Sequence, residues 1–146
     1  IKFNNFYREG DGWLIGLTPG VIGQFDRQYF VNSTQINGLI TDNLEASFSF
    51  QYSVLDALDI GQYDIQAADV RLLEDATDSS FEDHRFVSQF KLRYRLGAYS
   101  DVYLVYNRGG THIERSQQNM LQAKTLTALW QHRDQDTLTF KVRYLF

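Results

Sequence analysis

The sequence contains no cysteine, a single proline and no long hydrophobic run. The absence of cysteine excludes a disulfide framework and a thiolate metal site. A membrane-spanning helix needs roughly 18 to 20 consecutive apolar residues, and no segment of the chain approaches that length. The mean hydropathy of −0.38 is still compatible with a transmembrane β-barrel, because barrel strands alternate apolar with polar side chains.

Basic residues are also few, with 14 Lys and Arg against 18 Asp and Glu, for a net charge of −4. Nine of the acids lie between Leu55 and Asp83, where Arg71 is the single base. Nucleic acid is therefore not an expected partner, because phosphate contacts need clustered Lys and Arg. Ile1 opens strand-like sequence without the features of a signal peptide, so we expect a processed product or a fragment of a longer chain.

Aromatic residues are abundant, with 11 Phe and 9 Tyr, and they favour β-strands. The clearest strand pattern is the C-terminal segment Thr137–Phe146, where apolar residues recur at every second position. Successive side chains of a strand point to opposite faces, so one face of this segment is apolar and the other polar. Such a strand could be an ordinary amphipathic edge, but its aromatic end resembles the recognition strand that outer-membrane barrels present to their assembly machinery. The expected assembly signal consists of Phe140, Val142, Tyr144 and Phe146.

The same alternation recurs upstream and predicts an all-β protein with about seven strands. The predicted strands are Ile1–Arg8, Gly12–Val21, Arg27–Ile40, Leu44–Val54, His84–Leu96, Asp101–Asn107 and Thr137–Phe146. The connections comprise tight turns, a short link and two long loops. The tight turns are Glu9–Asp11, Thr41–Asn43 and Gly97–Ser100, the short link lies near Gly23–Asp26, and the loops are Leu55–Asp83 and Arg108–Asp136.

This arrangement is typical of an antiparallel transmembrane β-barrel, which has short periplasmic turns and long extracellular loops. If the C-terminus is periplasmic, counting the strands back from it places the three tight turns on the periplasmic side and both long loops on the extracellular side. An eighth strand at Gln122–Gln131 would allow a small closed barrel, but it would reverse the upstream directions. We therefore favour a short helix or irregular structure at Ser116–His132. Because seven is odd and bacterial barrels have even strand numbers, residues 1–146 are predicted to be the C-terminal part of one barrel domain that needs further strands.

Five basic residues alternate along two of the predicted strands and are expected to face the lumen. They are Lys91, Arg93, Arg95, Lys141 and Arg143. One interpretation is an anion-selective lining or a docking surface for a plug. The favoured interpretation is a structural polar network balanced by Glu45 and other acids, because buried charges need partners.

The acidic stretch Glu74–Asp83 could bind Ca²⁺ through clustered carboxylates. The candidates are Asp75, Asp78, Glu82 and Asp83. The stretch lacks the spacing and central glycine of an EF-hand loop, so a solvated surface loop is favoured, with a helical turn or two at Ala67–Glu74.

The three histidines, His84, His112 and His132, lie at strand ends or in loops and lack the spacing of a helical metal site. Ser116 with His112 and Glu114 lacks the elbow of a serine hydrolase. No catalytic residue, metal or cofactor is predicted.

The segment LRYRLGAYSDVYLVYNRGG, residues 92–110, and the terminal KVRYLF carry a resemblance. They resemble uncharacterised bacterial surface proteins that join an N-terminal carbohydrate-binding family 9-like module to a C-terminal β-barrel. The match covers about 30 residues, and the loop at 55–83 departs from the pattern. Since the module is absent here, the resemblance implies a barrel and carries over no sugar- or metal-binding residue.

The expected function is a non-enzymatic barrel of the bacterial outer membrane that serves as an anchor, a pore or a component of a surface complex. Its expected partners are outer-membrane lipid, the barrel-assembly machinery and further strands or a surface protein. Two alternatives stay open. One is an outer-membrane hydrolase acting on lipid or glycan, and the other is a soluble lipocalin-like barrel for a small ligand.

Overall fold

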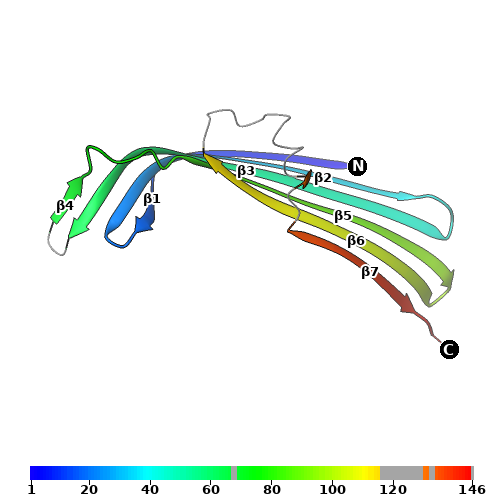
Figure 1. Cartoon of the computed structure of the whole chain (residues 1–146). Helices are drawn as coiled ribbons and strands as arrows, with labels where there is room; N and C mark the ends of the chain where they lie inside the picture. The colour runs from blue at the N-terminus through cyan, green and yellow to red at the C-terminus, as the bar shows by residue number, and fades with distance from the viewer. Residues whose placement is uncertain (67–68, 116–129, 132–133, 146) are drawn as a thin grey trace.

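In the computed structural model, the segments with alternating apolar and polar residues are strands of one seven-stranded antiparallel sheet (Figure 1). The structure describes residues 1–66, 69–115, 130–131 and 134–145. The strands are β1 (Lys2–Thr18), β2 (Val21–Leu39), β3 (Leu44–Gln66), β4 (Asp69–Leu72), β5 (Phe81–Gly97), β6 (Ser100–Arg115) and β7 (Gln135–Arg143). The all-β, antiparallel prediction is confirmed.

The sheet has the order β1-β2-β3-β5-β6-β7, and β4 pairs with the far end of β3. It is arched but not closed into a barrel, so β1 and β7 are its two edges (Figure 1). The turns at 40–43 and 98–99 lie at the same end of the sheet as the chain's C-terminus. The turn at 19–20 and β4 lie at the opposite end (Figure 1). In the described part of the chain, no helix is long and apolar enough to span a membrane.

The N-terminal predictions need correction, because two predicted strands are one. A tight turn at Glu9–Asp11 was expected, but β1 continues through it by means of a β-bulge between Gly10 and Trp13. Gly12 supplies the positive φ of 68° that the bulge requires. The predicted link at Gly23–Asp26 lies inside β2, and the chain instead reverses at 19–20, where Gly20 has a φ of 85°.

The predicted loop Leu55–Asp83 is also largely wrong, because most of it is strand. β3 extends to Gln66, and Asp69–Leu72 pairs with it as β4 where helical turns were expected. β6 likewise extends to Arg115, well into the predicted second loop. The predictions for Ser116–His132 lie outside the described residues except for 130–131, which are helical. The turns at Thr41–Asn43 and Gly97–Ser100 lie where they were predicted.

Residues that lie directly opposite each other on paired strands share a face of the sheet, and the register sorts the side chains into two faces. Phe48, Phe90, Tyr106 and Leu138 follow one another across β3, β5, β6 and β7. The next row consists of Ala46, Leu92, Leu104 and Phe140. We call this side the apolar face. The opposite side, which carries Lys91, Arg93, Arg95, Lys141 and Arg143, is called the charged face.

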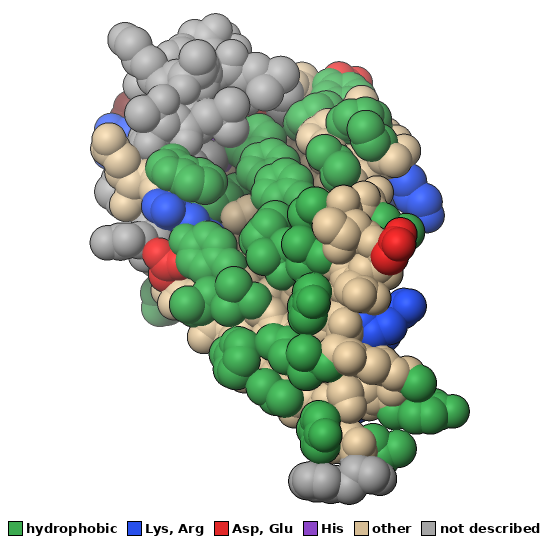
Figure 2. Space-filling model, turned by 90° about the vertical axis from the view of Figure 1, so that its right-hand side faces the viewer, with side chains coloured by type: hydrophobic (Ala, Val, Ile, Leu, Met, Phe, Trp, Pro, Cys, Tyr) green, Lys and Arg blue, Asp and Glu red, His purple; other side chains and the backbone are tan. Residues whose placement is uncertain are grey.

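Small clusters of buried side chains lie on both faces. On the apolar face, Tyr52, Val54 and Phe86 form a cluster with Phe30 and Phe50 packed against it. On the charged face, near the far end of the sheet, the rings of Phe25 and Phe81 meet edge to face at 5.9 Å. Neither cluster resembles the two-layer core of a soluble domain. Figure 2 views the end with the tight turns and shows hydrophobic side chains gathered in one band, with charged side chains on both sides of it.

Candidate functional site

The five basic residues predicted to face a lumen share the charged face, and acids accompany them. Arg93 lies opposite Glu45 and Tyr103, and Arg143 lies opposite Asp101. The Arg93 Nε donates to Asp101 Oδ1 at 3.1 Å, and its Nη1 lies 3.6 Å from Glu45 Oε2.

Asp101 also accepts a hydrogen bond from Arg143, and its side chain is almost fully buried. The Lys91 ammonium lies 5.5 Å from the centre of the Tyr103 ring, a cation–π contact. Arg95 and Lys141 are exposed on the same face. Two of the five basic residues, Arg93 and Arg143, thus pair with acids on this face, and their placement toward a lumen stays a prediction.

The residues predicted as an assembly signal divide between strand and tail. Phe140 and Val142 lie on the apolar face of β7, opposite Leu104 and Val102. Tyr144 follows the end of β7 and is exposed. Phe146 lies outside the described residues. In the described part of this terminal segment, the alternating apolar residues therefore lie in β7 and, for Tyr144, directly after it.

Beyond the apolar rows, the same face carries a row of four acids and one glutamine. Glu9, Gln28, Asp56, Glu82 and Glu114 lie opposite one another on β1, β2, β3, β5 and β6. The neighbouring row, one step closer to the apolar band, includes Val54, His84 and His112. Like charges in directly opposed positions repel each other, so carboxylates on three adjacent strands need positive charge nearby.

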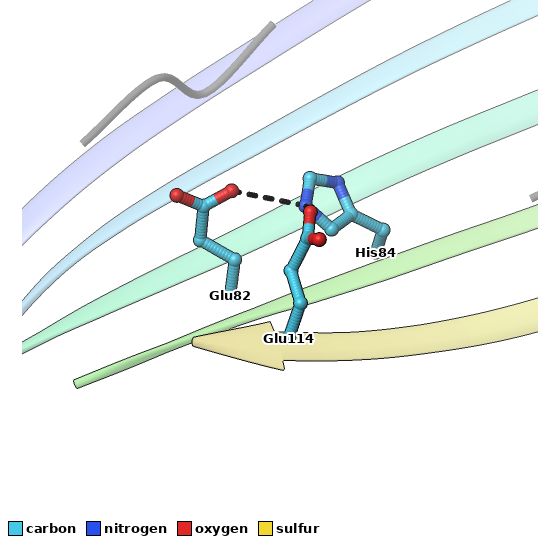
Figure 3. Close-up of side chains that lie close together, drawn as sticks. All are labelled: Glu82, His84 and Glu114. Atoms are coloured by element: carbon cyan, nitrogen blue, oxygen red, sulfur yellow. Dashed lines mark hydrogen bonds and ion pairs between the residues drawn. The ribbon is translucent and has the colours of Figure 1, made fainter. Parts of the chain in front are cut away.

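Three of these side chains converge at the β5–β6 pair, as Figure 3 shows. His84 Nε2 lies 3.1 Å from Glu82 Oε2 and 3.6 Å from Glu114 Oε1. His84 is fully buried, Glu82 is 3% exposed and Glu114 is half-exposed. On the other side of the ring, His84 Nδ1 lies 3.0 Å from the Tyr52 hydroxyl. The arrangement places one imidazole between two carboxylates, a donor set that suits a proton or a divalent metal ion.

This cluster was not predicted from the sequence, although a signal for it is present. Glu82 and His84 alternate on one strand, and His112 and Glu114 alternate on the next. A hairpin that turns at 98–99 brings Glu82 opposite Glu114 and His84 opposite His112. His84 and His112 are related by strand register and not by helical spacing, so a pattern of histidines at helical spacing does not include them.

The calcium site considered for residues 74–83 does not form as a cluster. Glu82 and Asp83 are adjacent in β5 and therefore point to opposite faces, and Asp83 forms an ion pair with Arg85 at 2.5 Å. Asp78 Oδ1 accepts hydrogen bonds from the backbone and hydroxyl of Ser80 at 2.9 and 2.6 Å. These hydrogen bonds hold the pKa of the Asp78 carboxyl below its usual value.

Hydrogen bonds also fasten the connection between β4 and β5 to the end of β3. Asp59 Oδ2 accepts from the Ser79 backbone at 3.1 Å and from the Gln62 amide at 2.6 Å. The Gln62 amide also donates to the Thr77 carbonyl at 2.7 Å. Asp59 thus serves as a hydrogen-bond acceptor that holds the β4–β5 connection against β3.

Comparisons of the chain with protein-family profiles, with curated proteins and with solved structures find no significant match.

Proposed function

We propose that the chain forms part of an integral β-barrel of the bacterial outer membrane and acts as an anchor, a pore or a component of a surface complex. The observation that carries this proposal is the exposed apolar face of a single-layer sheet. Leu138 and Phe140 are each 67% exposed there, and Val142 is 51% exposed. Soluble proteins cover such a face with a second layer, and large exposed apolar patches mark membrane or protein contacts.

The length of the apolar band supports the same proposal. From Leu44 to Val54, ten residue steps of about 3.4 Å extend about 34 Å along β3. This length includes Tyr52 and Val54, which are buried in the cluster with Phe86 at the far end of the band. A strand tilt of about 45° reduces this length to about 24 Å along the membrane normal. Outer-membrane barrels have an apolar band about 25 Å tall. The row containing Asp56 and Glu82 then lies just outside the hydrocarbon region.

The two open edges of the sheet indicate that the chain pairs with further strands. β1 and β7 each have one side without a strand partner among the described residues. Backbone groups within a bilayer need internal hydrogen bonds, which only a closed barrel provides for strands. Further strands are therefore part of the proposal, together with lipid on the apolar face and the barrel-assembly machinery as a transient partner.

One aromatic side chain of the apolar face is placed differently from the others. Phe86 is only 3% exposed, and its ring stacks on Trp130 with centroids 5.8 Å apart. The lipid-facing set in the proposal is therefore restricted to residues nearer the tight turns. These are Phe48, Phe50, Phe90, Phe140 and Val142.

Cysteine labelling tests the proposal directly, because the chain has no cysteine of its own. Single cysteines at Phe140 and Val142 are compared with cysteines at Thr139 and Lys141, which are their neighbours on the charged face. In membranes, a lipid-soluble reagent is expected to label the first pair, and a water-soluble reagent the second. Equal labelling of both pairs by the water-soluble reagent, or a protein that stays soluble without detergent, contradicts membrane insertion.

A further inference from the structure

We infer that Glu82, His84 and Glu114 form a binding site for a divalent transition metal of the zinc class. The three ligand atoms all lie within 4.8 Å of one another (Figure 3). In a tetrahedral zinc site with bonds of about 2.1 Å, neighbouring ligand atoms are about 3.4 Å apart. The separations of 3.1 and 3.6 Å from His84 Nε2 to the two carboxylates bracket that value.

The charge at this position favours a cation. Asp56, Glu82 and Glu114 occupy directly opposed positions on three adjacent strands. Glu82 is almost fully buried, and a buried carboxylate is costly unless it is paired with positive charge or coordinates a metal. A divalent ion between Glu82 and Glu114 would offset both charges at once.

The surroundings of His84 match those of a metal-binding histidine. Such histidines usually hold their second ring nitrogen in a hydrogen bond that fixes the orientation of the ring. His84 Nδ1 lies 3.0 Å from the Tyr52 hydroxyl, and the two rings are stacked with an interplanar angle of 23°. The Tyr52 hydroxyl can accept a hydrogen bond from protonated Nδ1, which leaves Nε2 free to bind metal.

The donor set also selects the class of ion. Calcium and magnesium prefer sites made of oxygen atoms alone, whereas imidazole suits zinc, copper, nickel and iron. With three protein ligands, a tetrahedral ion keeps its fourth position for water or another donor. The competing arrangement is a protonated His84 that bridges the two carboxylates without a metal.

Zinc titration of the purified native protein in detergent, against a chromophoric chelator, decides between these arrangements. The site does not depend on membrane insertion, so its failure leaves the proposed function untouched. One zinc ion per chain is expected to bind, and calcium is expected not to compete. The stoichiometric binding should disappear in Glu114→Gln, whose side chain is partly exposed and keeps its size. Glu74→Gln, an exposed carboxylate in the β4–β5 connection, is the matched control and should bind like the wild type.

Two further variants separate coordination from folding. His84→Gln should abolish zinc binding, and Tyr52→Phe should weaken it about 10- to 100-fold, as expected for a residue that orients a ligand. Circular dichroism must show the same strand content in each variant as in the wild type. The absence of stoichiometric zinc binding by the wild type, or unchanged binding by folded Glu114→Gln, overturns the inference and leaves the protonated bridge.

Discussion

An arginine at the centre of the apolar face provides a quantitative test of which face meets lipid. Phe90 lies opposite Phe48 and Tyr106, in the middle of the rows between Leu44 and Tyr52. If the apolar face meets lipid, Phe90→Arg places a charge near the bilayer midplane. At that depth arginine costs about 2–4 kcal/mol. The inserted fraction relative to the free chain should therefore fall about 30- to 900-fold.

The adjacent residue supplies a control at the same depth. Gln89 points to the charged face, where its amide donates to Asn107 Oδ1 at 2.7 Å. Gln89→Arg loses about 1 kcal/mol with that hydrogen bond, but it adds no charge to the lipid contact. Both variants are compared in the native protein by insertion into lipid vesicles across a urea series, read by heat-modifiable migration. Equal losses for the two variants, or a larger loss for Gln89→Arg, would refute the assignment of faces.

Two further predictions concern topology and assembly. An epitope inserted near Ser79 should be reachable by antibody on intact cells, whereas an epitope inserted at Ala98 should not be reachable. The opposite result would mean that the strands have the reverse orientation in the membrane. The double change Tyr144→Ala and Phe146→Ala should sharply lower the amount of membrane-inserted protein at equal expression. Lys141→Gln should leave it nearly unchanged, and equal insertion of all variants would mean that the terminal segment is not an assembly signal.

Strand alternation predicted the fold class but not the ends of the strands. In β3, the residues from Leu44 to Val54 alternate because one face is apolar and the other polar. Beyond Val54 both faces carry acids, so the pattern fades although the backbone pairing continues to Gln66. Glycine and aspartate at residues 9–12 suggested a turn, because a β-bulge uses the same residue types as a turn.

The candidate site could be predicted from the sequence only in part. Its three residues come from two strands, and their proximity follows from the register of the β5–β6 hairpin. The tight turn was predicted correctly, so the register could have been derived from it. The burial of His84 could not be derived in this way, because it depends on contacts with β3, which lies outside the β5–β6 hairpin.

The strand order has a consequence for how the protein folds. Each long strand pairs with the next long strand along the chain, and β3 also pairs with the short β4; no other contacts between elements occur in the described ranges. The hairpins β2–β3 and β5–β6 close over only a few residues, so their loop-closure entropy is small. The pairings of β3 with β5 and of β6 with β7 close across longer connections and are the slower steps. A cut at residues 73–80 would leave β1–β4 in one piece and β5–β7 in the other, with every tight hairpin intact. Such halves, produced separately, should be able to find each other through the β3–β5 pairing alone.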